Sequence, residues 1–223
     1  MIGKGHMRNF IAVLGLVFLV GASTGALAAD GVEAVFPLPR ADYSADDKTT
    51  FNADGYEYKV FYSQGKMRSE YDYATPNGTK VTEVAINRVD LKLSWTLKPD
   101  VKMYVTMKNR DKVPFAMLQT DGLINVYQYD RVGQKPQGEE KINGVTAAKY
   151  KVWMENEKGK RLEGFVWRTK DDITVRVDVS ESGKPGKSNR LFRELKNLKV
   201  AKQNPAFFEI PSGYKESAEG YVK

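Results

Sequence analysis

The chain of 223 residues contains no cysteine, and its single histidine, His6, lies in a segment with the features of a cleaved secretory signal. These two residue types supply the soft metal ligands of proteins and the side-chain base that works near neutral pH. Their scarcity excludes Ser-His and Cys-His nucleophile pairs, zinc or copper sites with imidazole or thiolate ligands, haem ligation by either residue, and thiol redox chemistry. Carboxylate, Ser-Lys and tyrosine chemistry remain, and we expect neither a metal nor a cofactor.

Hydrophobic residues make up 41% and charged residues 28% of the chain, which are ordinary values for a globular protein. Disorder throughout is therefore excluded, and the length suits one domain. The formal net charge of +7 is a modest excess that favours anionic surfaces such as lipid head groups.

Residues 1–28 have the features of a cleavable secretory signal. Lys4 and Arg8 precede an apolar run over residues 10–20, and Ala26 and Ala28 provide the small residues of a cleavage site. The run is shorter than the roughly 20 residues that span a bilayer, and no later segment comes close. We therefore expect a periplasmic protein without a transmembrane anchor after cleavage, and no nucleic acid as a partner.

From Tyr56 onward, apolar and polar residues alternate with a period of two, as they do in half-buried strands. Turn residues such as Gln64-Gly65 and Asn77-Gly78 separate the runs. The pattern predicts strands at residues 56–62, 67–73, 81–86, 91–97, 101–107, 124–129, 146–154, 162–168, 173–179 and 191–200.

The remaining segments lack this alternation. Residues 29–55 predict an extended N-terminal arm, residues 133–144 and 180–188 predict loops, and residues 215–223 predict a tail. Residues 114–120 predict a helical turn or a loop. The fold class that follows is mainly β, with a single strongly curved antiparallel sheet and few short helices.

Motifs for catalysis or metal binding are incomplete. Ser63 and Lys66 have the spacing of a Ser-x-x-Lys nucleophile, but they straddle a predicted hairpin instead of a helical turn. Residues 50–61 align with a calcium-binding loop, yet the last position, which must supply a bidentate carboxylate, is Phe61. We therefore expect a protein that is not an enzyme. The basic segment 184–202 is either a solvated surface or an anion-facing one.

Large apolar side chains, including Trp95, Trp153 and Trp167, either pack a core or line a site for acyl chains. A single sheet with few helices cannot cover its own apolar face. The sheet therefore either curls onto itself or holds a hydrophobic molecule.

Four short motifs resemble the LolA/LolB superfamily of lipoprotein carriers, above all its uncharacterised periplasmic relatives of the outer-membrane lipoprotein-sorting type. The motifs are GKMRSE at residues 65–70, LSWTLKPD at 93–100, GEEKING at 138–144 and FFEIPSGY at 207–214. The resemblance covers residues 56–214 and implies a LolA-like half-barrel whose concave apolar face, closed by short helices, accommodates acyl chains. The cavity residues that it implies are Met67, Arg68, Leu93, Trp95, Met103, Val105, Phe115, Met117 and Leu118.

One feature departs from the carriers that these motifs resemble. Those carriers begin with an amphipathic helix, whereas residues 29–55 contain Pro37 and Pro39 and have no helical period. The hypothesis is a soluble periplasmic protein that holds a lipid or an acylated protein without covalent chemistry. The alternative is an envelope interaction module with a self-filled core that docks a protein partner.

Overall fold

The computed structural model describes residues 31–75, 77–108, 126–184 and 187–217 of the chain. Its short helical elements are α1 (Val32–Val35) and the 3₁₀ turns η1 (Val126–Gln128) and η2 (Pro205–Phe208). Its strands are β1 (Tyr43–Phe51), β2 (Asp54–Ser63), β3 (Lys66–Ala74), β4 (Lys80–Arg88), β5 (Leu93–Lys98), β6 (Met103–Lys108), β7 (Arg131–Ile142), β8 (Val145–Glu155), β9 (Arg161–Arg168), β10 (Thr174–Lys184), β11 (Lys187–Val200) and β12 (Lys215–Glu216).

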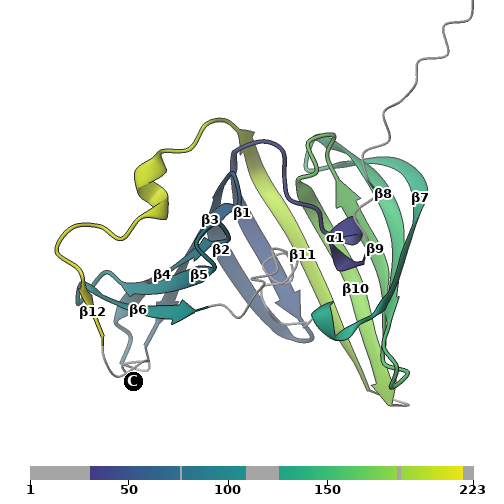
Figure 1. Cartoon of the computed structure of the whole chain (residues 1–223), viewed down its shortest axis with the longest axis horizontal. Coiled ribbons are helices and arrows are strands. Elements are labelled where there is room, and N and C mark those ends of the chain that lie inside the picture. Colours follow the sequence, from purple (N-terminus) through teal and green to yellow (C-terminus); the bar gives the residue numbers. More distant parts are fainter. Residues whose placement is uncertain (1–30, 76, 109–125, 185–186, 218–223) are drawn as a thin grey trace, which may run out of the picture.

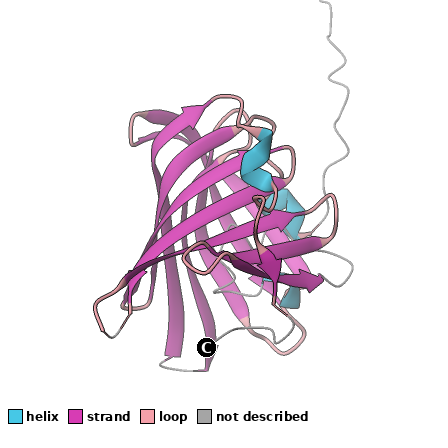
Figure 2. Ribbon diagram, turned by 90° about the vertical axis from the view of Figure 1, so that its left-hand side faces the viewer, coloured by secondary structure: helices cyan, strands magenta, loops and turns pink. Residues whose placement is uncertain are grey.

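These strands form one sheet in the order β12-β6-β5-β4-β3-β2-β1-β11-β10-β9-β8-β7. The sheet joins two antiparallel meanders, β1–β6 and β7–β11, through the antiparallel pair of β1 and β11. Figure 1 shows the meanders on the two sides of this pair, and Figure 2 shows how strongly the sheet curves. The sheet does not close into a barrel, so the predicted fold class is confirmed.

Tight hairpins follow from residues that accept a positive φ. Gln64 and Gly65 between β2 and β3 have φ values of 48° and 78°, and Asn143 and Gly144 between β7 and β8 have 49° and 85°. Two successive positive φ values are typical of the two-residue turns whose twist matches that of the flanking strands. The turn that the sequence predicts at Gln64-Gly65 is therefore confirmed.

The predicted arm contains a strand that the sequence pattern did not indicate. Residues Tyr43–Phe51 form β1, which pairs with both β2 and β11 near the middle of the sheet. The expectation of an arm without regular structure is wrong over these residues. The reason is that Asp47 and Thr49 occupy inward positions, so that the apolar alternation used for prediction is broken.

Two predicted loops are also strands. Residues 133–144 belong mostly to β7, an exposed edge strand with a bulge between Pro136 and Glu139. Residues 180–184 and 187–188 lie at the ends of β10 and β11. An edge strand and a hairpin tip both face water, so their residues are polar and give no apolar period. The strand predicted at 124–129 is corrected as well, because Val126–Gln128 form η1.

The sheet has two faces, which we name by the helical element that covers each. On the α1 face, Val32, Val35 and Phe36 pack among buried residues of β8–β11. On the η2 face, Phe208 packs against Val84, Ile86 and Leu97 of β4 and β5. Among the described residues, no helix is long and apolar enough to span a membrane. The predicted signal lies outside the described residues.

A buried ion pair joins the two meanders. Arg193 on β11 and Asp47 on β1 form a salt bridge, and both side chains are 0% exposed. In the register of β1 and β11, Arg193 lies opposite Thr49, which is two residues from Asp47 on the same face of the sheet. Because each charge is withdrawn from water, each depends on the other for its stabilisation.

Candidate functional site

The predicted cavity residues that the structure describes lie on both faces of the sheet. Met67 pairs with Tyr62, which shares the α1 face with Tyr43 at the start of β1. Val105 on β6 lies opposite Thr96 on β5, and Thr96 lies opposite Ala85 on β4. Ala85 lies opposite Ser69, which is two residues from Met67 on β3. Val105, and Met103 two residues before it, are therefore on the same face as Met67. These three residues point toward the α1 face.

Arg68, Leu93 and Trp95 point the other way. Arg68 and Trp95 both oppose Ile86, which packs under Phe208 on the η2 face. Arg68 donates from Nη1 to the carbonyl oxygen of Phe207 at 3.2 Å. These three residues are therefore separated by the sheet from Met67, Met103 and Val105. Phe115, Met117 and Leu118 lie outside the described residues, and ligand binding by the nine stays a prediction.

A different set of residues surrounds a hollow with an apolar wall. This hollow, the β9–β10 pocket, has a volume of about 680 Å³ and lies where β8 begins and where β9 and β11 end. Its apolar wall comes from β8 and β11, and its polar rim comes from the turn between β9 and β10 and from Arg40. The lining residues are Arg40, Glu139, Val145, Thr146, Ala148, Tyr150, Arg168, Thr169, Lys170, Asp171, Asp172, Leu198 and Val200.

Arg168 is the buried cation of the β9–β10 pocket, with 7% of its surface exposed. It donates to the carbonyl oxygen of Ala34 and to Oε1 of Gln134, each at 2.9 Å. Its guanidinium carbon lies 4.1 Å from the centre of the Tyr150 ring. Gln134 also donates to Ala34 at 2.9 Å, so this network ties α1 to β7 and β9. All these partners of Arg168 are neutral.

The β9–β10 turn is fixed by its own hydrogen bonds. The hydroxyl of Thr169 accepts from the backbone N–H groups of Asp171 and Ile173, each at 3.2 Å. Arg40 forms a salt bridge with Asp172 at 2.8 Å and also donates to the carbonyl oxygen of Lys170. The turn is therefore held against the segment that precedes β1, which gives the pocket a defined polar rim.

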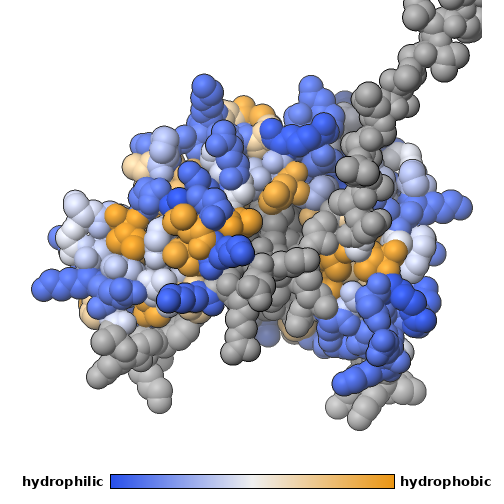
Figure 3. All heavy atoms as spheres, viewed as in Figure 1, coloured by the Kyte–Doolittle hydropathy of each residue, from blue (hydrophilic) through white to orange (hydrophobic). Residues whose placement is uncertain are grey.

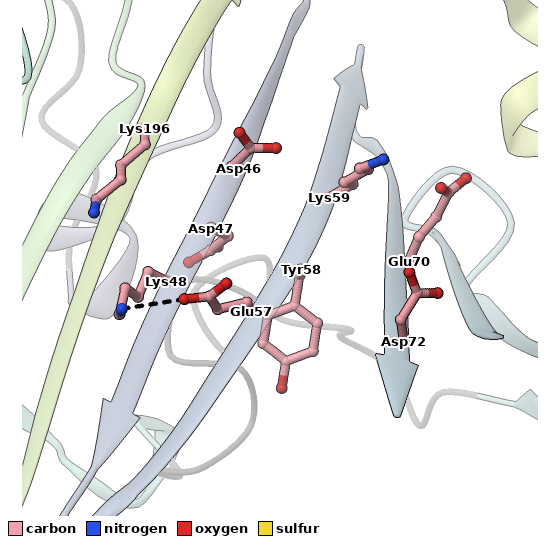
Figure 4. A pocket seen from close by; sticks show the side chains of 9 residues that line it. All are labelled: Asp46, Asp47, Lys48, Glu57, Tyr58, Lys59, Glu70, Asp72 and Lys196. Carbon is pink, nitrogen blue, oxygen red and sulfur yellow. Dashed lines mark ion pairs between the residues drawn. The ribbon is translucent and has the colours of Figure 1, made fainter. Parts of the chain in front are cut away.

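A second hollow, of about 440 Å³, is charged instead of apolar. Figure 4 shows its side chains along β11, β1, β2 and β3, where Lys48 and Glu57 form an ion pair at 3.1 Å. Opposite charges face each other across the strands, as Asp46 does with Lys59 and Lys59 with Glu70. Such cross-strand pairs stabilise a solvent-facing sheet surface. Its lining side chains are charged apart from Tyr58, so it is the weaker candidate for an apolar ligand.

A polar cluster surrounds Glu181, a 5% exposed residue of β10. Its Oε1 accepts from the Tyr129 hydroxyl at 2.5 Å and from Gln128 at 2.9 Å, and it forms a salt bridge with Lys160 at 2.8 Å. Burial opposes ionisation of Glu181, but the hydrogen bonds from Lys160, Tyr129 and Asn189 outweigh it and lower its pKa. Burial, followed by the bond to Glu181, raises the pKa of Tyr129. The cluster fixes η1 against β10.

Sequence reasoning missed the β9–β10 pocket for identifiable reasons. Its members are short or polar residues such as Ala148, Thr169 and Lys170, which no apolar alternation singles out. Arg168 and Ala34 are 134 positions apart in the chain, so their contact leaves no local pattern. The Lys170-Asp171-Asp172 sequence indicates a turn but not a pocket.

Neither a protein-family model nor a curated protein matches this chain. Solved structures are similar in fold. An uncharacterized conserved protein from Thermus thermophilus is 12% identical with a TM-score of 0.46, over 80% of this chain and 90% of the other. A LolA superfamily protein from Nitrosomonas europaea is 7% identical with a TM-score of 0.37, over 80% and 94%.

A third similar structure is the MucA/MucB complex of Pseudomonas aeruginosa. There the identity is 11% and the TM-score 0.42, over 80% of this chain but 57% of the matched one. This chain therefore spans little more than half the length of that protein. One of these similar structures, that from Nitrosomonas europaea, is of a protein in the superfamily that the sequence motifs resemble. At these identities the similarity concerns the fold and not the activity.

Proposed function

We propose that this chain is an exported, periplasmic binding protein that holds a lipid or the acyl chains of a lipid-modified polypeptide without covalent chemistry. The observation that carries the proposal is the β9–β10 pocket, about 680 Å³ in volume and walled by Val145, Ala148, Leu198 and Val200. Pockets of about 300–1,000 Å³ with apolar walls and a few polar groups are typical of small-molecule sites. Each buried methylene contributes about 0.8 kcal/mol, so a single acyl chain suffices for useful affinity.

The residues around the pocket favour binding over catalysis. A nucleophile needs a base within hydrogen-bond reach, and the hydroxyl of Thr169 instead accepts bonds from two backbone N–H groups. The carboxylate of Asp172 is held in a salt bridge with Arg40. Among the described residues, no group of three or more carboxylates or imidazoles is placed to hold a metal ion.

The test is uptake of a fluorescent fatty acid by delipidated full-length protein. Ala148→Trp places a large ring in the pocket and should abolish uptake, whereas Ala74→Trp, at an exposed position of β3, should leave it unchanged. Circular dichroism of both variants checks that they are folded. Equal uptake by both variants, or no uptake by the unmodified protein, would contradict the proposal.

A second candidate is the interaction module with a self-filled core. The specific observation that favours it is the packing of Val32, Val35 and Phe36 into the α1 face of β8–β11, where a half-barrel carrier would hold its ligand. In that case a protein partner would bind outside the sheet. Recovery of one envelope protein in constant ratio from lipid-free material, together with absent fatty-acid uptake, would favour this candidate.

A further inference from the structure

The β9–β10 pocket contains a cation that nothing in the described structure neutralises. Arg168 is only 7% exposed, and it forms no ion pair with any carboxylate of the described residues. Its Nε is buried and has no hydrogen-bond partner there. A buried charge that lacks a counter-ion destabilises the folded protein, and an anion that reaches it reduces this cost.

The pocket is also divided into an apolar part and a charged part. Val145 and Ala148 from β8 and Leu198 and Val200 from β11 form one side, while residues 168–172 form the other. This separation matches the build of an amphiphile, with a chain at one end and a polar head at the other.

The three cations of the pocket differ in what they can offer. Arg40 is already engaged by Asp172 at 2.8 Å. Lys170 is exposed, and its ammonium group has no ion pair within the described parts of the chain. Arg168 and Lys170 therefore supply positive charge to the polar rim. The acids Glu139 and Asp171 oppose it. Glu139 and Lys170 are both exposed, so the fields of both are screened within about a Debye length, whereas the charge of buried Arg168 is screened less.

We infer that the β9–β10 pocket selects an anionic amphiphile, a lipid with one acyl chain and a negatively charged head group, over a zwitterionic lipid with the same chain. The acyl chain lies against β8 and β11, and the head group lies at the β9–β10 turn, where Lys170 and the field of Arg168 stabilise its charge. The inference rests on the proposed function, because it assigns the head group of the ligand whose chain the pocket holds.

The experiment compares lysophosphatidylglycerol with lysophosphatidylcholine of the same chain length, by titration calorimetry below their micelle concentrations. The unmodified protein should bind the anionic lipid about tenfold more tightly, a factor that corresponds to 1.4 kcal/mol. Raising the salt concentration should reduce this preference and leave the affinity for lysophosphatidylcholine unchanged. Inorganic phosphate alone should not compete at the same concentration.

Four variants sharpen the comparison. Lys170→Gln should remove several-fold of the preference, whereas Lys158→Gln, an exposed lysine in the β8–β9 loop, should leave it intact. Asp171→Asn should strengthen binding of the anionic lipid only. Arg168→Gln should lose the preference while keeping the affinity for lysophosphatidylcholine. If Arg168→Gln loosens α1 and weakens binding of both lipids, Lys170→Gln and Asp171→Asn decide the question, because neither side chain forms a hydrogen bond with the described residues.

The outcomes distinguish the inferred head group from the proposed function. Equal affinity for both lipids in the unmodified protein overturns the head-group inference and leaves the proposed function standing. Failure of both lipids to bind overturns the proposed function itself. Competition by inorganic phosphate at the lipid concentration would show a site for a free anion. That outcome also overturns the inference that the ligand is an anionic amphiphile.

Discussion

Two regions of the sheet are built from the same kind of strand but bury apolar residues on opposite faces. Strands β1–β3 share the α1 face with β7–β11, since Tyr43, Tyr62 and Met67 are buried there, whereas β4 and β5 differ. In β7–β11, the residues packed around Phe36 lie on the α1 face, whereas in β4 and β5 the residues around Phe208 lie on the η2 face. Phe36 precedes the first strand, and Phe208 follows β11. Segments at opposite ends of the described chain therefore cover opposite faces of one sheet.

This difference corrects the expectation of a sheet with one apolar side. Figure 3 shows apolar residues gathered in separate areas over the two meanders, each bordered by charged residues. A strand presents a face to each side, and whichever side receives a covering segment can be apolar. The difference between β4–β5 and the rest of the sheet teaches that the covering segments decide which face becomes the core.

The largest effect is expected at the joint between the meanders. Asp47→Asn leaves the guanidinium of Arg193 buried without its counter-ion, which should lower the free energy of unfolding by about 3–5 kcal/mol. Urea denaturation followed by circular dichroism measures this loss. The double variant Asp47→Leu with Arg193→Met should recover most of it, because replacing a whole buried pair by apolar groups is close to neutral. A double variant as unstable as the single one would contradict this account.

The two covering phenylalanines form a matched pair, since both are 1% exposed. Phe36→Ala and Phe208→Ala should each lower the free energy of unfolding by about 3 kcal/mol, the low end of the range for buried phenylalanine, because short covering segments can resettle. The consequences for the pocket should differ. Arg168 donates to Ala34 of α1, so Phe36→Ala should weaken lipid binding, whereas Phe208→Ala should not.

Hydrogen exchange can show which part of the sheet each of the two phenylalanine substitutions loosens. Phe208→Ala should speed exchange of the amides of Lys215 and Ser217, which bond to Lys102 and Tyr104. Phe36→Ala should instead speed exchange near α1. Equal changes at both places in both variants would show that the meanders do not open independently.

A smaller effect is expected from the Glu181 cluster, which belongs to the second meander alone. Glu181→Gln removes charged hydrogen bonds and should cost about 1.5–3 kcal/mol at pH 7. The folded-state pKa of Glu181 is lowered from the ordinary value of 4.5, so its contribution is present above that value. The contribution is lost as the pH falls through the folded-state pKa. The variant should therefore differ less from the parent at pH 3 than at pH 7, in urea unfolding.

At the alkaline end the same cluster acts through Tyr129. Its pKa is raised above the ordinary value of 10.0, so its contribution is present below pH 10 and is lost as the pH rises further. Tyr129→Phe should flatten the alkaline limb of the stability curve. An unchanged slope above pH 10 would show that the phenol does not couple to folding.

The smallest effect is expected in the charged hollow. Lys48 and Glu57 form an ion pair between side chains that are 52% and 75% exposed. Exposed pairs contribute about 0.2–1 kcal/mol, so Lys48→Ala should change the free energy of unfolding by less than 1 kcal/mol. A thermal melt at low and at high salt checks this. A larger loss in the free energy of unfolding that does not depend on salt would contradict the expectation for an exposed ion pair.

The alternating segments of the chain are where sequence reasoning succeeded. The alternation in residues 173–179 and 162–168 correctly places β10 and β9, since a half-buried strand imposes a period of two on its own residues. It failed at β1 and β7, where an inward Asp47 and an exposed edge remove that period. The sequence did not predict the candidate site, because Arg168, Gln134 and Ala34 come into contact only in the folded protein.

By itself, the sequence determined the chemistry that this protein lacks and the mainly β character of its fold, since both depend on residue type and local spacing. The tertiary structure alone decided which face each part of the sheet buries, the pairing of Asp47 with Arg193 and the shape of the β9–β10 pocket. These features arise from contacts between residues more than a hundred positions apart, such as Arg168 with Ala34. Local alternation fixes the direction of a side chain relative to its neighbours, but only the assembled sheet fixes what that side chain meets.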